Sequence, residues 1–217
     1  MAQKSSNPIS RPRGRPRNFD EADVLETARD VFWTNGYAAT SLDELAAATG
    51  LNRPSLHAAF GDKHSLYLRT LADNRELSVD GIRQHLSNDV PLRDALYNFL
   101  LDAADSTLAG GNGARGCFVV CTAVTEALLD ADTRAIAAGY VQDVDQVFRE
   151  RFERSAAELN AGVDPASAAT VASAMLQTLA VRARTGSSRK QLADVARAAV
   201  AAICCPPKPD LDNGETL

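Results

Sequence analysis

The sequence lacks any run of 18 consecutive apolar residues, so we expect no membrane-spanning helix. Residues 1–18 are polar and basic and contain no apolar stretch of the kind that a secretory signal requires, so we also expect no export. The composition is otherwise ordinary, with 45% hydrophobic and 24% charged residues. A chain of 217 residues has room for one or two small domains and can bury a core without disulfides or metal.

Cysteine and histidine are scarce, with four and three residues respectively. Cys117 lies four residues before Cys121, and Cys204 is adjacent to Cys205; neither spacing is that of a zinc site, and no histidine cluster completes one. We therefore expect no metal and no cofactor, and free thiols in a reducing cytoplasm. No phosphate-binding loop and no nucleophile with a base and an orienting group is visible, so the sequence does not predict an enzyme.

The formal net charge of -5 conceals an asymmetry along the chain. Residues 1–18 hold five bases and no acid, whereas residues 19–70 hold four bases and eight acids. A basic tail on an acidic body favours an anionic partner that is met at one end only.

Helical periodicity runs through most of the chain, and strand-like alternation of useful length is absent. Asp20, Ser41 with Glu44, and Asn52 are the predicted N-caps of the first three helices. About nine helices are expected in all, over residues 20–35, 41–48, 53–59, 62–86, 91–108, 115–129, 132–160, 165–185 and 188–204. The pattern predicts an all-α fold with disordered tails at residues 1–18 and 206–217.

The second and third expected helices are short and flank a turn at Gly50, which is typical of a helix-turn-helix. Leu45, Leu56 and Phe60 are predicted to point inward, which leaves polar residues at the start of the third helix outward. Such a turn can enter the major groove of DNA. A helical hairpin that only packs against the body gives the same pattern, so the spacing alone leaves both interpretations open.

The residues around this turn resemble those of the TetR family of bacterial transcriptional regulators. The resemblance rests on Gly36 to Ala46 and on Thr49 to Lys63, and it covers residues 19 to about 67. It implies an all-helical homodimer with an N-terminal three-helix DNA-binding domain at 19–67 and a C-terminal ligand-binding and dimerisation domain at 68–205. It also implies an inverted-repeat operator in double-stranded DNA, and release from that operator when a small-molecule inducer binds.

The resemblance also assigns the DNA contacts. Arg53 and Ser55 match positions that face bases, and Lys63 matches a phosphate-binding lysine at the start of the fourth helix. His57 stands where the family usually has Tyr, which puts that one phosphate contact in doubt. The remaining predicted contacts of the domain are Thr40 and Ser41, which resemble phosphate-binding positions, and Asn52 and Pro54, which open the recognition helix.

The basic arm contains Pro12-Arg13-Gly14-Arg15-Pro16, which resembles the core of an AT-hook. Glycine lets the backbone approach closely, and the arginines reach into the negative potential of a narrow A·T-rich minor groove. We predict that Arg13, Arg15 and Arg17 contact DNA in this way. The alternative is a solvated basic tail.

Cys117 and Cys121 share an apolar helix face, where free cysteine is usually a core residue. The alternative is a thiol sensor of oxidants or electrophiles, in which the nearby Arg115 would lower a thiol pKa.

The last two helices are rich in small residues, which suits close packing across a two-fold axis. The predicted dimer interface consists of Val171, Met175, Leu179, Leu192, Val195 and Ala199. The leading prediction is therefore a ligand-responsive repressor. An architectural DNA-binding protein is the alternative, and the large C-terminal half argues against it because such a protein needs no effector domain.

Overall fold

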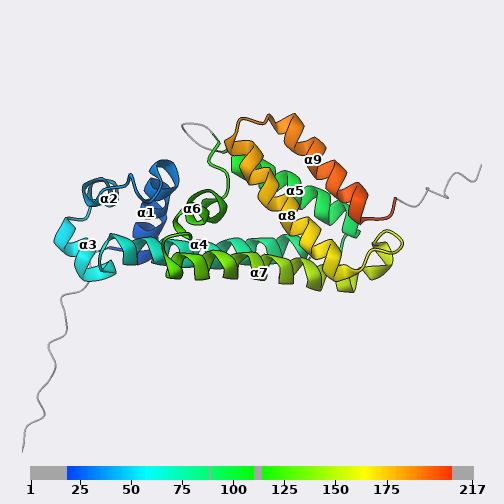
Figure 1. The fold of residues 1–217 in the computed structure, drawn as a ribbon, viewed down its shortest axis with the longest axis horizontal. Coiled ribbons are helices and arrows are strands. Elements are labelled where there is room, and N and C mark those ends of the chain that lie inside the picture. Colours follow the sequence, from blue (N-terminus) through cyan, green and yellow to red (C-terminus); the bar gives the residue numbers. More distant parts are fainter. Residues whose placement is uncertain (1–18, 88, 110–113, 207–217) are drawn as a thin grey trace, which may run out of the picture.

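The computed structural model describes residues 19–87, 89–109 and 114–206. Apart from one isolated bridge between Leu159 and Cys204, the regular structure of these residues is helical (Figure 1), which confirms the predicted all-α fold. The predicted basic arm, with Arg13, Arg15 and Arg17, lies outside the described residues, as does the C-terminal tail from residue 207.

Three helices form the N-terminal unit: α1 (Glu21–Asn35), α2 (Leu42–Thr49) and α3 (Arg53–Phe60). The described residues that follow contain six further α-helices, together with a π-helix η1 and a 3-10 helix η2. These elements are α4 (Lys63–Leu86), α5 (Leu92–Leu108), η1 (Val119–Ala123), α6 (Val124–Glu126), α7 (Ala131–Arg154), η2 (Ala156–Glu158), α8 (Pro165–Arg184) and α9 (Arg189–Ile203).

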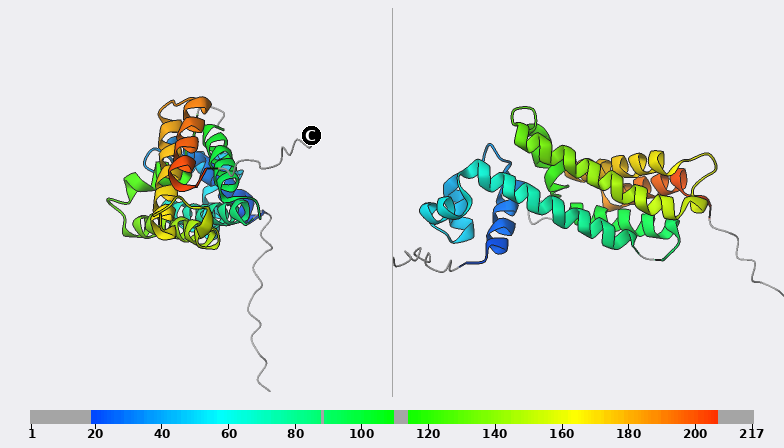
Figure 2. Two further views of the ribbon diagram at one scale, coloured as in Figure 1. Left: turned by 90° about the vertical axis from the view of Figure 1, so that its right-hand side faces the viewer. Right: turned by 90° about the horizontal axis from the view of Figure 1, so that it is seen from below.

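Helices α4 and α7 are the longest elements and lie side by side along the molecule (Figures 1 and 2). The N-terminal unit sits at one end of this pair, where α1 packs against α4. At the other end α8 crosses α7, and α5 and α9 pack against α8 and each other. No helix of the described residues is both long and apolar enough to cross a membrane.

The predicted caps are present because capping depends on neighbours in the sequence. Asp20 accepts a hydrogen bond from the Ala22 N–H, and Asn52 accepts one from the Ser55 N–H. Ser41 and Glu44 form the predicted capping box, in which each side chain bonds the other residue's backbone N–H. These bonds fix where α1, α2 and α3 begin.

The expected helix at 115–129 is wrong at both ends, because residues 115–117 are irregular and residues 127–129 form a turn. The carbonyl of Arg115 accepts the Trp33 indole N–H and a bond from Arg184, and the Gly116 N–H donates to the carbonyl of Thr107, so these groups are committed to other elements. Regular structure begins as η1, whose wider turn is rare and concentrates at functional sites.

Only glycine fits at position 116. Its φ is +70°, and a Cβ there would lie 2.6 Å from the Sγ of Cys121 and 2.9 Å from the carbonyl oxygen of Ala180. At Gly116 the irregular segment 114–117 therefore passes unusually close to α8 and η1.

The expected helix at 132–160 ends early, at Arg154. The residues that follow bond to other elements instead of continuing the helix. The Glu158 carboxylate accepts a hydrogen bond from the Leu92 N–H, and the Glu158 carbonyl accepts one from the Cys205 N–H. The ends of α5, α7 and α9 are joined at this corner, which sequence periodicity does not report.

An aromatic cluster joins the N-terminal unit to the rest of the molecule. Tyr67 of α4 lies 5.0 Å from Phe32, 4.7 Å from Tyr37 and 6.3 Å from Phe118 between ring centroids. Trp33 of α1 lies 5.6 Å from Phe118. Because these rings are largely buried, the two units share one continuous core and cannot move independently without repacking it.

Candidate DNA-binding surface and effector cavity

The geometry of α2 and α3 is that of a helix-turn-helix. Gly50 is left-handed with φ +68°, which turns the chain sharply between the two helices. Leu45, Leu56 and Phe60 are buried beneath them, as the sequence predicts. Pro54 lies in the first turn of α3, where a missing N–H breaks no helical bond.

The start of α3 presents a polar face to solvent. Asn52, Arg53, Pro54 and His57 are exposed and Ser55 is half-buried. The Ser55 backbone N–H donates to the Asn52 side chain. The Nδ1 of His57 lies 3.2 Å from the carbonyl oxygen of Gly61, so this ring folds back over the end of α3.

Arg53 is already paired within the protein. Its guanidinium makes two contacts with the carboxylate of Asp43 on α2, and this raises the arginine pKa through hydrogen bonding first and charge second. Both side chains are more than half exposed. Asp43 is not among the residues predicted from the sequence, although an acid in the first turn of α2 and an arginine in the first turn of α3 are visible there.

Three of the predicted phosphate contacts, Thr40, Ser41 and Lys63, have hydrogen-bond partners within the protein in this structure. Thr40 is 2% exposed and its hydroxyl donates to the Gly36 carbonyl at 2.7 Å, so its side chain is not available to DNA. Lys63 donates from Nζ to the carbonyls of Tyr37 and Thr40, at 3.0 and 2.9 Å. This ammonium therefore pins the α1–α2 connection to the start of α4. Ser41 is exposed, but its hydroxyl donates to Glu44.

A cavity of about 240 Å³ opens in the C-terminal part of the molecule. Its wall draws on four aromatic rings and on neutral polar side chains, with one carboxylate. It is lined by Trp33, Asn74, Ser78, Gly81, Ile82, His85, Phe99, Asp102, Ala103, Ser106, Thr107, Gly116, Cys117, Phe118, Tyr140 and Leu176. Sequence analysis named only Cys117 of these as a site residue, because the others come from six separated segments.

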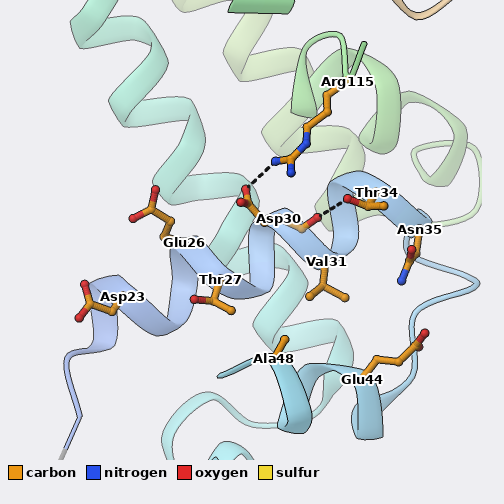
Figure 3. A pocket seen from close by; sticks show the side chains of 10 residues that line it. All are labelled: Asp23, Glu26, Thr27, Asp30, Val31, Thr34, Asn35, Glu44, Ala48 and Arg115. Atoms are coloured by element: carbon orange, nitrogen blue, oxygen red, sulfur yellow. Dashed lines mark hydrogen bonds and ion pairs between the residues drawn. The ribbon is translucent and has the colours of Figure 1, made fainter. Parts of the chain in front are cut away.

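Trp33 brings the N-terminal unit into this wall. It belongs to α1, yet it lines the cavity and donates its indole N–H to the Arg115 carbonyl at 3.0 Å. The Arg115 guanidinium returns to α1, where it pairs with Asp30 at 3.2 Å (Figure 3). Arg115 thereby also lines a second, acidic hollow between α1 and α2, which contains Asp23, Glu26 and Glu44 (Figure 3).

The cysteines lie in a different environment from the one predicted for a sensor. Arg115 points to Asp30, and burial raises the pKa of the Cys117 thiol. That thiol is 3.8 Å from the Tyr140 hydroxyl. The expectation that Arg115 lowers a thiol pKa is therefore wrong for Cys117. Cys121 is half-buried and does not line the cavity.

Three of the residues predicted for the dimer interface belong to the protomer's own core. Leu179 and Leu192 are fully buried, and Ala199 is 4% exposed, so none of them can meet a second copy. Met175 and Val195 are partly buried against the same core. Val171 and Val181 of α8 are exposed.

Comparison with known proteins finds relatives that share this sequence pattern and this fold. Residues 24–70 match the profile described as bacterial regulatory proteins, tetR family. The transcriptional repressor BdcR of Escherichia coli (strain K12) is 30% identical over 197 residues, which are 89% of this chain and 94% of BdcR. A cysteine mutant of the TetR-family regulator CifR, solved with a 26-base-pair operator, is 31% identical with a TM-score of 0.76, over 87% of this chain and 99% of that one.

The chain belongs to the TetR family. A second relative, the repressor ComR of the same E. coli strain, is 28% identical over 90% of this chain and 94% of its own length. These TetR-family relatives are transcriptional regulators rather than enzymes or architectural proteins. The described part of this TetR-family chain contains no cluster of His, Cys, Asp and Glu that could hold a metal ion.

Proposed function

We propose that this chain is a homodimeric transcriptional repressor that binds an inverted-repeat operator in double-stranded DNA and leaves it when a small-molecule inducer enters the cavity. Its place of action is the cytoplasm, where bacterial DNA lies. The helix-turn-helix supports the DNA partner, and the names of BdcR and ComR support repression.

The proposed contacts follow the exposed start of α3. Arg53 and Ser55 read base edges in the major groove, and Asn52, Pro54 and His57 lie beside them. Ser41 and Lys63 contact phosphate once DNA competes for their present partners. In the arm, Arg13, Arg15 and Arg17 contact the minor groove. Thr40 is not retained in this set, because its hydroxyl is buried.

The observation that carries ligand-controlled release is Trp33 in the cavity wall. A ligand shifts an equilibrium only if it binds one conformation better than the other. Because Trp33 and Asp30 tie α1 to the 114–118 segment, a ligand that repacks Trp33 or Phe118 displaces α1. Displacing α1 changes the spacing of the two recognition helices in the dimer, and thus the fit to two half-sites.

The dimer is proposed to form through the outer faces of α8 and α9. Val171 and Val181 are large exposed apolar residues of α8, and Met175 of α8 and Val195 of α9 are only partly buried. The domain division proposed at residue 67 falls inside α4, so this helix continues from the DNA-binding unit into the ligand-binding unit.

The experiment uses DNA from immediately upstream of the gene, searched for an inverted repeat by footprinting. Trp33 is the sole tryptophan, so its fluorescence reports ligands in the cavity directly. Compounds that change this fluorescence should lower operator affinity, measured by fluorescence anisotropy of labelled DNA. Trp33→Phe should keep operator binding and require more ligand for release. Ligands that change Trp33 fluorescence without changing operator affinity would show that the proposed ligand-controlled release is wrong.

A further inference from the structure

The wall of the cavity constrains the chemistry of the effector, and not only its position. We infer that the effector is a compact aromatic or apolar molecule without negative charge, whose polar end is neutral or cationic and faces Asp102. This inference rests on the proposed function, because it concerns the ligand that enters the same cavity.

The first support is the aromatic wall. Trp33, Phe99, Phe118 and Tyr140 line one small cavity, and Trp33 packs on Phe118. The face of an aromatic ring carries partial negative charge, so it attracts flat rings and cations and repels anions. The volume of about 240 Å³ is below the usual 300–1,000 Å³ of ligand pockets, which favours a small ligand.

The second support is the charge of the lining. Among the described residues that line the cavity there is neither lysine nor arginine, and the one carboxylate is Asp102. Its Oδ2 lies 3.4 Å from the Nε2 of His85, and both side chains are about half exposed, which places them at the mouth. Arg115, the guanidinium of the adjoining segment, is occupied by Asp30. The one other side chain of this lining that can carry positive charge is His85, and it is already paired with Asp102. An anionic ligand would thus lose its hydration without gaining a free cationic partner.

The third support comes from two weak acids in the wall. Burial raises the pKa of the Cys117 thiol, and it raises the pKa of the Tyr140 phenol well above its usual value. Both shifts have desolvation as their largest cause, so the wall penalises negative charge where these groups stand. A ligand carboxylate in the same place meets the same penalty.

The remaining polar groups suit a neutral hydrogen-bonding group. Asn74 is buried and donates from its amide to the Ser78 hydroxyl at 3.2 Å. Thr107 is less available, because its hydroxyl donates to the Ala104 carbonyl. A hydroxyl or N–H of the ligand can bond with Asn74 and Ser78 inside or with Asp102 at the mouth.

The test uses matched ligands that differ only in charge. At pH 7, benzyl alcohol is neutral, benzylamine is cationic and benzoate is anionic, and the phenethyl and cyclohexylmethyl series repeat this set. Binding is followed by Trp33 fluorescence and by calorimetry. We expect the alcohols and amines to bind and the carboxylates to bind at least about tenfold more weakly.

Variants assign the selectivity to the cavity. Asp102→Asn should weaken binding of the amines roughly two- to fivefold, which is the contribution expected of an exposed ion pair, and should leave binding of the alcohols unchanged. Asp80→Asn is the matched control, an exposed acid of α4 that pairs with Arg83 and does not line the cavity. Asp102→Arg should improve benzoate binding. Ser106→Phe, at an exposed lining position, should abolish binding of all members.

The two proposals fail in different ways. Carboxylates that bind as tightly as the matching alcohols would overturn the inferred charge selection, as would failure of every alcohol and amine to bind at millimolar concentration. Binding with the expected selectivity, but with unchanged operator affinity, would uphold the selection and overturn ligand-controlled release.

Discussion

The imidazole of His64 and the carboxylate of Asp130 meet at 2.7 Å, and they join the start of α4 to the start of α7. Asp130 is the N-cap of α7 and also accepts hydrogen bonds from the backbone and hydroxyl of Thr133. The pair therefore ties the start of α4, the helix that follows α3, to the start of α7.

This pair predicts a pH dependence of stability. The hydrogen bond to Asp130 raises the pKa of His64, and the bonds from Thr133 and His64 lower the pKa of Asp130. The His64 contribution is complete below its unfolded pKa of about 6.5 and is lost as the pH rises through the higher folded value. The Asp130 contribution is present above about pH 4 and is lost as the pH falls through the lower folded value.

Thermal unfolding between pH 5.5 and 8.5 measures the loss of the His64 contribution at high pH. The melting temperature of the native protein should fall across this range, and His64→Gln should remove part of that fall. His85→Gln is the control, a more exposed histidine 3.4 Å from Asp102. Identical pH profiles for the native protein and His64→Gln would contradict the prediction.

Arg53→Ala should cost roughly 1–3 kcal/mol of operator binding and relax preference at one base pair, as expected for a bidentate base contact. Asp43→Asn leaves Arg53 in place but weakens the pair that orients it. We expect Asp43→Asn to keep the overall affinity for the operator and to lose part of the preference at the base pair that Arg53 contacts. The measurement is anisotropy with operators altered one base pair at a time.

Lys63→Ala is the comparison for these variants. It should weaken all DNA sequences alike and reduce the salt slope by about one unit per protomer. If Arg53→Ala and Lys63→Ala lose affinity equally on operator and random DNA, Arg53 is not a base contact.

The thiols should be dispensable for DNA binding. A Cys117→Ser/Cys121→Ser variant should fold and bind the operator, with a stability loss of roughly 1–3 kcal/mol where a hydroxyl replaces a buried thiol. Because burial raises the Cys117 pKa, that thiol is protonated at neutral pH and reacts slowly. We expect peroxide or N-ethylmaleimide to affect operator binding by both proteins equally. Release of the native protein alone would establish the thiol sensor instead.

Val171→Glu should separate the dimer without unfolding the protomer. Val171 is 41% exposed, so the substitution disturbs little of the protomer's own packing. Light scattering should give the monomer mass, and operator affinity should be lost because one protomer holds one half-site. Leu77→Glu, at a more exposed apolar residue of α4, should remain dimeric. A Val171→Glu protein that stays dimeric would place the interface elsewhere.

Deletion of residues 1–18 should reduce DNA affinity and leave the melting temperature nearly unchanged. The arm carries five cations, and each phosphate contact changes the log–log salt slope by about 0.9. We expect the slope to fall by roughly 4 to 8 units per dimer. The loss should be larger when A·T pairs flank the half-sites. An unchanged slope would make the arm a passive tail, and a changed slope without flank preference would exclude the AT-hook.

The sequence predicts best what depends on near neighbours. The caps Asp20, Ser41 and Asn52 are correct because each bonds a backbone group two or three residues away. Thr40 and Lys63 were placed on DNA by resemblance, but their partners in this structure depend on how α1, α2 and α4 meet. The burial of Leu179 and Leu192 likewise depends on packing between α5, α8 and α9, which a helical pattern cannot assign to one protomer or two.

The π-helix η1 allows this chain to lose one residue at one place. A π turn holds about one residue more than an α turn, so loss of one residue from 119–123 would regularise the helix. Because the wider turn absorbs that residue, the side chains that follow would keep nearly their present directions, and Val124 would stay exposed. The contact at risk lies inside the turn, where the Thr122 hydroxyl accepts a hydrogen bond from the Tyr67 hydroxyl at 3.2 Å. A single-residue deletion in 119–123 should therefore disturb the protein less than one inside α7, which would rotate every later side chain of that helix by about 100°.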